Sequence, residues 1–588
     1  MSCLHLLFLP LLLVTTATII AFPLSRYIAW IMDGKYTSLP IVGWIEKRLD
    51  SGPQNWKQYA GSLLLFNTLL FVFGYLVLAL QPYLPLNPEG KTLLSPTTIF
   101  HSAISFMTNT DLQHYSGEVY LSNFSQIFFG IVNLFLSAAT GFSALTAIIR
   151  AFRGESLGNF FVDVWRVVFY LFLPIAFLIA IVFISQGSPM TFQSSVTAST
   201  LEKGEPQTLV VGPVAAFESM KMLGTNGGGF YGANSAHPFE NPTGFSNILN
   251  ALSMMLFPFA LVLTYGRMLK RFKHSLVIFS VMLLLMICTI SWSIFFDTMQ
   301  PNPAFTAHPA RAFSLIQIPS VPSLPVDQHL GNLEGKELRF GIVGGSTFAA
   351  LTADVTCGAT NAQMDSLNPL AGLSPMVGVW LNCIFGGKGV GMINMLFYLI
   401  IGIFIAGMMV GRTPEYLGKK IGVREVKLAI IGLLVHPLMI LMPLGLFTML
   451  PWGADALGNP GPHGFSEMLY QFCSASANNG SAFDGLRVTY GFYNNPTPAP
   501  QAIPWDIATG IVMVLSRFLP IIAPIALAAS LGAKKTSPFS LGTLRDDTVT
   551  FGFLLLGTIF IVGALLFFPV AALGPLAEHL GPIPFGGG

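Results

Sequence analysis

The stretch Gly224-Thr225-Asn226-Gly227-Gly228-Gly229 interrupts a strongly apolar part of the chain. A half-length apolar segment precedes it and a long one follows. Irregular backbone is too costly to expose to lipid, so a segment of this kind at membrane depth must line a polar path. Three further segments lie in the same setting, and each resembles the lining of an ion filter: Thr108-Asn109-Thr110, Thr356-Cys357-Gly358 and Asn478-Asn479-Gly480.

The composition is that of a polytopic membrane protein. Of 588 residues, 53% are hydrophobic and 10% are charged, whereas an ordinary soluble domain has about 25% charged residues. Ten stretches are apolar and long enough to cross about 30 Å of hydrocarbon. We place them at 4–24, 61–82, 122–149, 163–186, 246–269, 274–298, 374–411, 426–450, 503–532 and 550–573.

Lys and Arg are distributed unevenly between the two sides of the predicted membrane. The loops after the odd-numbered stretches, counted with the adjoining helix ends, hold 20 of them, and the opposite loops hold 7. These residues mark the cytoplasmic side most reliably in short loops, so both termini are predicted outside. A cleaved signal peptide is the alternative for 4–24, but the usual basic start is missing, and we favour a retained helix.

An internal repeat organises the chain: span, half-length helix, polar segment and span recur four times. Gly227, Gly358 and Gly480 are successively 131 and 122 residues apart. We therefore predict an all-α integral membrane protein in which four membrane-pore-membrane repeats surround a pseudo-fourfold pore. The predicted parts are 1–58 (first helix and cytoplasmic loop), the repeats 59–155, 156–272, 273–422 and 423–535, and 536–588 (last helix).

Each half-length helix is expected to reach only halfway across the bilayer. Helices of roughly 10–14 residues are about 15–20 Å long, and their C-terminal dipole ends would face the pore centre and favour a cation. The expected start signals are Ser95-Pro96, Pro213, Ser346 and His463-Gly464-Phe465-Ser466.

The polar segments have the chemistry of a cation filter. Stacked backbone carbonyls replace the water around an alkali cation without adding negative charge, so the ion can leave again. Glycine permits the dihedral angles that point successive carbonyls inward. The predicted filter residues are Thr108, Asn109, Thr110, Thr225, Asn226, Gly227, Thr356, Cys357, Gly358, Asn478, Asn479 and Gly480; the first segment has no glycine, so the ring is expected to be asymmetric.

The seventh apolar stretch contains polar residues and glycines at mid-membrane. Asn382, Gly386, Gly387, Lys388 and Gly389 all lie there. A kinked helix is one interpretation and a mobile loop below the filter is the other. We favour the loop because a kink does not require a lysine.

Four further polar residues have two interpretations each. Arg517 lies inside the ninth stretch, where it either snorkels to the cytoplasmic rim or serves the pore. Asp111 is either part of a polar mouth, where water satisfies it, or a residue that concentrates cations at the entrance. Asp354 either caps the preceding short helix or ties it to a neighbouring element. Arg412 is expected to be an interfacial anchor or a partner contact.

No energy-coupling chemistry is visible in the sequence. A phosphate-binding GxxxxGK[ST] motif is missing, since Gly387-Lys388-Gly389 lacks the Ser or Thr, and no DKTGT phosphorylation motif occurs. The five cysteines indicate neither a disulfide framework nor a metal cluster. We therefore expect no catalytic residues and no bound nucleotide in this chain.

Several longer strings resemble one family. GTNGGGFYGANSAHPFENPT (224–243), EGKELRFG (334–341), GRTPEYLGKKI (411–421), NPGPHGFSE (459–467) and SANNGSAF (476–483) are similar to the potassium-binding A subunit of the bacterial Kdp potassium-transporting ATPase, the KdpA family. The resemblance covers nearly the whole chain.

The resemblance implies a potassium-channel-like pore that takes K⁺ from outside and passes it to an ATP-hydrolysing partner. The implied partners are a P-type ATPase B subunit, a C subunit and a small F subunit in the bacterial plasma membrane, with lipid around them. No nucleic acid and no second copy of the chain are expected for the pore.

The resemblance also implies roles for single residues. The filter role carries onto the four segments with Gln113 at the entrance, the gating loop onto Asn382–Gly389, and a pore-region role onto Arg517. The chain departs from the family pattern in the gating loop, where we expect an acidic residue near Asn382 and a GGVGSG-like run, and instead find Lys388.

Two other functions are weighed against this one. A stand-alone channel or cation symporter of the same superfamily is disfavoured by the EGKELRFG and GRTPEYLGKKI strings. A membrane-embedded enzyme would need clustered His, Asp or Glu within the spans, and the spans are nearly free of them.

Overall fold

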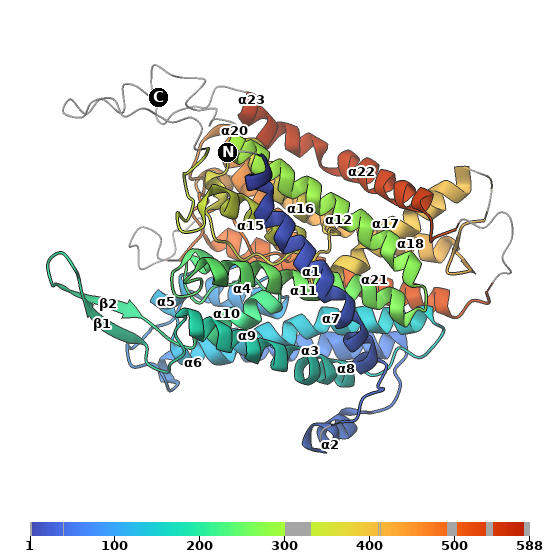
Figure 1. Cartoon of the computed structure of the whole chain (residues 1–588), viewed down its shortest axis with the longest axis horizontal. Helices are drawn as coiled ribbons and strands as arrows, with labels where there is room; N and C mark the ends of the chain where they lie inside the picture. The colour runs from blue at the N-terminus through green and yellow to red at the C-terminus, as the bar shows by residue number, and fades with distance from the viewer. Residues whose placement is uncertain are drawn as a thin grey trace.

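Long apolar helices lie side by side through the molecule, and Figure 1 shows them running in one general direction. This computed structural model describes residues 3–38, 40–299, 331–409, 411, 413–490, 502–536 and 545–580. Within these residues, ten helices are long and apolar enough to cross a membrane, as the sequence predicts. They are Leu6–Met32, Trp56–Ala79, Asn123–Phe152, Phe160–Gln186, Gly244–Met268, Phe272–Met299, Val390–Met409, Val423–Met449, Ala502–Gly532 and Val549–Leu580.

The spans are built from the following elements, some of which include a π-helical turn. They are α1 (Cys3–Met32), α3 (Trp56–Ala79), α6 (Asn123–Ser125) with α7 (Val132–Phe152), α8 (Phe160–Arg166) with α9 (Leu173–Gln186), α11 (Gly244–Met268), α12 (Phe272–Ile294), α17 (Val390–Met409), α18 (Val423–Met449), α21 (Ala502–Gly532), and α22 (Val549–Ala571) with α23 (Ala577–Leu580).

Four shorter helices lie between the long ones, and each is followed by one of the polar segments. They are α4 (Pro96–Met107), α10 (Val214–Leu223), α15 (Gly341–Asp354) and α20 (Gly461–Ala477). Each packs on long helices: α4 on α3 and α21, α10 on α9 and α11, α15 on α12, and α20 on α18 and α21. The order of long helix, short helix, polar segment and long helix thus recurs four times along the chain.

Apart from three 3₁₀ turns, the remaining elements of the described residues are short α-helices and β-strands. They are α2 (Pro40–Leu49), α5 (Gly117–Tyr120), α16 (Pro369–Leu381), α19 (Pro451–Ala454), and the antiparallel pairs β1 (Ser195–Ser199) with β2 (Pro206–Val210) and β3 (Glu415–Tyr416) with β4 (Lys419–Lys420). The hairpin β1–β2 projects from the body (Figure 1). It lies in the loop 187–212, one of two long loops on the side that the sequence predicts to be external. Most of the other loop, 300–330, is outside the described residues.

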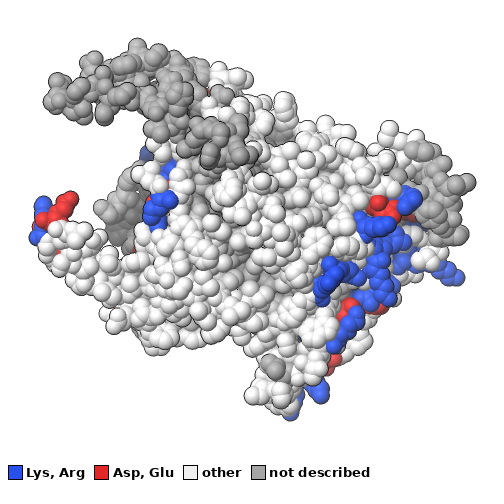
Figure 2. Space-filling model, in the orientation of Figure 1, with Lys and Arg blue, Asp and Glu red and all other residues white. Residues whose placement is uncertain are grey.

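Basic residues gather at one end of the helices. Figure 2 shows Lys and Arg at the end where α2 lies, and Figure 1 places the start of α1 and α23 at the opposite end. Salt bridges link the loops at the basic end: Arg153 with Asp33, Arg166 with Glu46 and Lys534 with Glu425. Arg412 lies in a loop that the sequence predicts at this basic end, but it is outside the described residues.

The predictions of where the short helices start are only partly correct. Ser95 caps α4 by accepting a hydrogen bond from the Thr98 N–H, as expected of a Ser-Pro pair. The prediction that Ser346 caps its helix is wrong, because α15 begins at Gly341 and Ser346 lies in its second turn. Its hydroxyl donates to Asp297 instead, which is a tertiary contact that local sequence cannot reveal.

Candidate functional site

The four polar segments share one backbone hydrogen bond at the end of the preceding short helix. In each, an N–H donates to a carbonyl five residues earlier: Thr110 to Ser105, Asn226 to Lys221, Cys357 to Thr352 and Asn479 to Ser474. The same turn therefore ends all four short helices, and it aligns the four segments residue by residue. Thr110, Asn226, Cys357 and Asn479 occupy equivalent positions.

This structural alignment differs by one residue from the alignment that sequence similarity suggests for the first segment. By sequence, Thr108-Asn109 matches Thr225-Asn226, whereas in the structure Asn109 is equivalent to Thr225. Asn109, Thr225, Thr356 and Asn478 form the first position, and all four have positive φ. Gly227, Gly358 and Gly480 form the third position with φ of +95°, +93° and +104°, and Asp111 takes that position in the first segment with φ of +53°. Thr108 is the C-cap of α4 and lies before the aligned positions.

The third positions bring the four segments into a closed ring. A Cβ atom built on Gly227 would meet the Cys357 carbonyl and Gly358, closer than 3.0 Å. One on Gly358 would likewise meet Asn479, and one on Gly480 would meet the Thr110 carbonyl. Segment two thus touches three, three touches four, and four touches one.

The contact between the first and second segments closes the ring in a different way. Here the side chain belongs to Asp111, and a Cβ atom built on the facing Gly228 would lie 3.0 Å from the Asp111 Cβ. Aspartate is one of the few residues that adopt a left-handed conformation readily. The absent side chain of Gly228 therefore makes room for the one that Asp111 carries.

Side-chain amides tie the ring together and hold its carbonyls. Asn109 Nδ2 donates to the Thr225 carbonyl at 3.1 Å, and Asn226 Nδ2 donates to Asn109 Oδ1 at 3.0 Å. On the fourth segment, Asn478 Nδ2 donates to Thr110 Oγ1 at 2.9 Å. Asn234, which sequence reasoning did not single out, donates from Nδ2 to the Gly227 carbonyl at 2.6 Å.

An outer cavity of about 480 Å³ opens on the third positions of the ring. Its lining includes Asp111, Gln113, Gly227, Gly358 and Gly480. Gln113 holds the neighbouring segment with both ends of its amide, because Oε1 accepts from the Gly229 N–H at 2.8 Å and Nε2 donates to the Gly229 carbonyl at 3.0 Å. Asp111 is fully buried and forms no salt bridge among the described residues.

A much smaller cavity, of about 10 Å³, lies on the other side of the ring. Its lining includes the first positions Asn109, Thr356 and Asn478 together with Lys388 and Arg517. Lys388 is 3% exposed, and its ammonium has no hydrogen-bond partner among the described residues. Arg517 is also buried, and its Nη2 donates to the Ser137 carbonyl at 3.3 Å. Arg517 therefore faces the ring and does not snorkel to the rim.

Lys388 belongs to a loop that separates α16 from α17. The loop, 382–389, is hydrogen-bonded to the end of α15, since the Gly386 N–H donates to the Asp354 carbonyl at 3.0 Å and the Gly387 N–H to the Val355 carbonyl at 2.7 Å. Its other side packs on Gly141 of α7, where a Cβ atom would meet the Lys388 carbonyl. The third segment thus rests directly on this loop.

A second small cavity adjoins the first and extends sideways. The two share Asn382, Val390 and Asn478 in their linings, and the second continues between α17, α18, α21 and α22 past Gly432, His436 and Phe567. Its volume is about 20 Å³. The space on the inner side of the ring is therefore narrow and branches laterally.

Buried ionic contacts hold the short helices from behind, and sequence reasoning missed most of them. Lys221 of α10 pairs with Glu240 at 2.6 Å and also with Glu218, all fully buried. Asp354 at the end of α15 accepts from Thr289 of α12 at 2.6 Å, which makes it a tie between helices. The signal in the sequence that could have revealed these contacts is the presence of charged residues inside an otherwise apolar half-length helix.

A histidine at the N-terminal end of α20 lies between two carboxylates. His463 Nε2 lies 3.0 Å from Asp365 Oδ1, and its Nδ1 lies 2.7 Å from Glu578 Oε1. Burial alone lowers the pKa of His463, but the two carboxylates raise it more strongly, to about 10. The imidazole is therefore protonated at neutral pH and forms ion pairs with both carboxylates.

The family model and the curated relative agree on one family. The family model described as potassium-transporting ATPase A subunit matches residues 11–580. A potassium-transporting ATPase potassium-binding subunit of Geobacillus kaustophilus is 44% identical over 573 residues, which are 96% of this chain and 97% of that protein. The crystal structure of the potassium transporter TrkH from Vibrio parahaemolyticus has a TM-score of 0.49 at 13% identity, covering 81% of this chain and 85% of that one.

Proposed function

Because this chain belongs to the family of potassium-transporting ATPase A subunits, we propose that it binds external K⁺ in the four-segment ring and passes it to an ATP-hydrolysing partner. The ring is the selectivity filter of this proposal, with Gln113 at its entrance. The loop 382–389 and Arg517 form the gate region on its inner side.

One observation carries the proposal: four backbone turns from distant parts of one chain close into a ring. Each turn follows a short helix, and in the second turn side-chain amides hold the carbonyl groups of Thr225 and Gly227. A ring of carbonyl oxygens replaces the hydration shell of an alkali cation without binding it irreversibly. The repeat boundaries 59–155, 156–272, 273–422 and 423–535 are the corresponding units in our proposal.

The shape of the inner side supports a lateral transfer of the ion. Two buried cationic side chains, Lys388 and Arg517, face the small cavity under the ring. A positive charge there repels K⁺ from the direct path to the cytoplasm. The adjoining cavity leads sideways between α17, α18, α21 and α22, which agrees with delivery to a neighbouring subunit.

The rest of the assembly follows from the family resemblance. We propose that the ATP-hydrolysing partner is a P-type ATPase B subunit, with a C subunit and a small F subunit in the same complex. This chain then contributes no catalytic residue and binds no nucleotide. The purified chain is expected to hydrolyse no ATP, and hydrolysis that persists after all other subunits are removed would refute this part.

The orientation follows from the charge distribution. Because Lys and Arg gather at the end of the helices that carries α2, we propose that this end lies in the cytoplasm of a bacterial cell. The outer cavity and both termini are then on the external side of the plasma membrane. Labelling a cysteine placed at Leu201, which is fully exposed at the tip of the outer hairpin, with an impermeant reagent tests the orientation.

The filter itself is tested by Gly358→Ser in the assembled complex. A side chain at φ +93° is strained by about 1–2 kcal/mol, and its Cβ would also collide with the Asn479 carbonyl. We expect the K⁺ concentration for half-maximal ATPase activity to rise at least ~30-fold, since each tenfold step corresponds to about 1.4 kcal/mol. The preference for K⁺ over Rb⁺ is expected to fall as well.

Gly557→Ser is the matched control, because a Cβ atom at Gly557 meets nothing within 4 Å. Unchanged K⁺ affinity and ion preference in an assembled Gly358→Ser complex would mean that these segments do not form the filter.

A further inference from the structure

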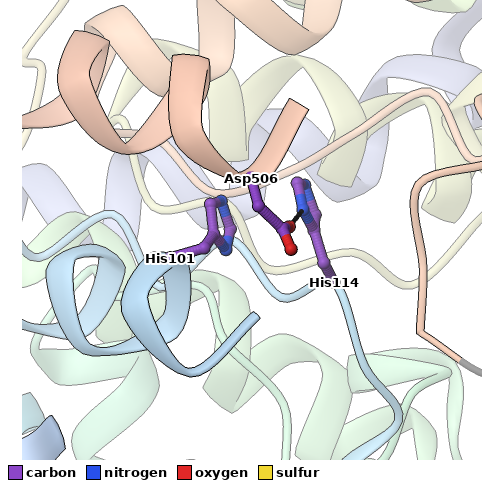
Figure 3. Close-up of side chains that lie close together, drawn as sticks. All are labelled: His101, His114 and Asp506. Atoms are coloured by element: carbon purple, nitrogen blue, oxygen red, sulfur yellow. Dashed lines mark hydrogen bonds and ion pairs between the residues drawn. The ribbon is translucent and has the colours of Figure 1, made fainter. Parts of the chain in front are cut away.

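A cluster of two histidines and an aspartate lies behind the outer end of the first segment (Figure 3). His101 comes from α4, His114 follows Gln113 in the chain, and Asp506 lies in the first turns of α21. All three residues are 1% exposed or less. The proposed filter function does not account for this cluster.

The two residues His114 and Asp506 form the strongest contact in the cluster. His114 Nδ1 and Asp506 Oδ1 are 2.6 Å apart, and Asp506 Oδ2 accepts from Thr98 Oγ1 at 3.0 Å. When Nδ1–H donates to Asp506, Nε2 is left as an acceptor, and the Gln471 Nε2 amide group lies 2.8 Å from it. His114 is thus held by α21 and α20 at once.

A shared metal ion does not fit the geometry of the imidazoles. The rings of His101 and His114 are stacked with centroids 3.9 Å apart and planes 10° from parallel. An ion bound by two imidazoles lies along a nitrogen lone pair of each, and therefore near both ring planes. Two separated parallel planes cannot both contain the ion, so the cluster acts through hydrogen bonds and stacking.

The location of the pair explains what it does. Segments one to four follow each other in the chain, so three of the four contacts of the ring join neighbouring units. The fourth contact joins the first unit to the last one, and His114 and Asp506 are 392 residues apart in sequence. This is the contact where Gly480 meets the Thr110 carbonyl and Asn478 bonds to Thr110.

We propose that the His114–Asp506 pair is a positioning pair that closes the filter ring between the first and fourth segments and thereby sets its ion preference. The inference rests on the proposed filter function and assigns two residues to its specificity. His114 lies three residues beyond Asp111 and next to Gln113, so a shift of His114 moves both lining residues. A looser ring surrounds K⁺ less tightly and discriminates less against Rb⁺.

The test uses the whole complex and two variants of His114. His114→Leu removes both hydrogen bonds, whereas His114→Gln retains an N–H that can donate to Asp506. We expect His114→Leu to raise the K⁺ concentration for half-maximal ATPase activity about tenfold, as for loss of one charge-assisted hydrogen bond. Its preference for K⁺ over Rb⁺ is expected to fall at least ~3-fold, and His114→Gln should recover most of that preference.

Asp163→Asn is the matched control, because Asp163 forms a buried pair with Arg150 at 2.8 Å on α8, at the basic end of the molecule. It is expected to lower thermal stability and leave the K⁺/Rb⁺ ratio unchanged. The ratio is independent of the amount of complex, so it is measured even where a variant assembles poorly. A parental ratio in His114→Leu would overturn the proposal.

A parallel measurement on Gly480→Ser separates this inference from the filter proposal. If Gly480→Ser changes the K⁺/Rb⁺ ratio and His114→Leu does not, the pair is only structural. If neither variant changes the ratio, the ring is not the filter and both proposals fail.

His101 provides a further check on the stacking. Neither ring nitrogen of His101 has a hydrogen-bond partner among the described residues, so its contribution to the cluster is the flat face against His114. His101→Phe keeps that face, and we expect a K⁺/Rb⁺ ratio within ~2-fold of the parent. His101→Ala removes the face and is expected to lower the ratio; a loss in His101→Phe equal to that in His101→Ala would show that the nitrogens matter.

Discussion

The two sides of the four-segment ring differ in size and in charge. The outer cavity has a volume of about 480 Å³ and includes Asp111 in its lining. The inner cavity has a volume of about 10 Å³, and Lys388 and Arg517 line it. In the proposed function, an ion meets a wide mouth lined by Asp111 before the ring and a narrow space lined by Lys388 and Arg517 after it. This difference teaches that selectivity and direction are separate features of the proposed function: in that proposal the ring selects the ion, and Lys388 and Arg517 below it determine the direction in which the ion leaves.

Among changes that compare the two sides of the ring, the largest effect is expected from removing the lysine ammonium on the inner side. Lys388→Met keeps the length of the side chain and removes the ammonium, which costs on the order of 3 kcal/mol to place at mid-membrane. We expect passive K⁺ flux through the complex in liposomes without ATP to rise at least ~10-fold, and pumping to become less efficient. The flux is measured with a K⁺-sensitive dye trapped inside the vesicles.

Lys427→Met is the control for Lys388→Met, because Lys427 is an exposed lysine at the basic end of α18. Passive flux in Lys388→Met equal to that of the parent would mean that the inner charge does not close the direct path.

The place of Asp111 on the outer side depends on the missing side chain of Gly228. Gly228→Ala puts a methyl group 3.0 Å from the Asp111 Cβ, and overpacking of this kind typically costs about 1–3 kcal/mol. We expect the ATPase rate at saturating K⁺ to fall ~5-fold, as for a loss of about 1 kcal/mol. Adding Asp111→Gly removes the facing Cβ and should restore part of the rate; a double variant no better than Gly228→Ala would disprove this pairing.

A smaller effect is expected from neutralising the outer side while keeping its shape. Asp111→Asn retains size and the tolerance for positive φ, so the ring should persist. We expect the apparent K⁺ affinity to fall ~2- to 5-fold, as for loss of about 0.5–1 kcal/mol of attraction between the carboxyl group and the ion, with the K⁺/Rb⁺ ratio unchanged. Titrating K⁺-stimulated ATPase activity measures both, and a parental affinity would show that the carboxyl group does not attract the ion.

The smallest effect concerns how the outer ends of two short helices are held. Ser95 caps α4 with an uncharged hydroxyl, whereas His463 at the start of α20 pairs with two carboxylates that raise the pKa of His463 to about 10. A raised pKa means that the folded state binds the proton more tightly. This stabilisation is complete below about pH 6.5, the ordinary pKa of histidine, and is lost as the pH rises through 10.

We therefore expect the midpoint of thermal unfolding of the detergent-solubilised complex to fall by a few degrees between pH 6.5 and 10. His463→Gln should flatten this part of the profile, and Ser95→Ala should lower the midpoint without changing its slope. A profile with the parental slope in His463→Gln would assign the pH dependence to other groups.

Much of the fold was predictable because hydrophobic spans are a property of local composition. All ten spans follow from the thickness of the hydrocarbon and the scarcity of charge within them. The Ser95-Pro96 cap is equally local. Ser346 shows the limit, because its hydroxyl has a tertiary partner, Asp297, and the helix begins before it.

The sequence by itself determined the apolar spans, the short helices between them and the four polar segments, since these depend on side chains a few residues apart. Only the tertiary structure decided the register of the first segment, the pairing of Asp111 with Gly228, and the placing of Lys388 and Arg517 under one ring. The physical reason is distance along the chain: His114 and Asp506 are 392 residues apart and meet only when the first polar segment packs beside the helix that follows the fourth one. No local pattern of residues predicts that contact.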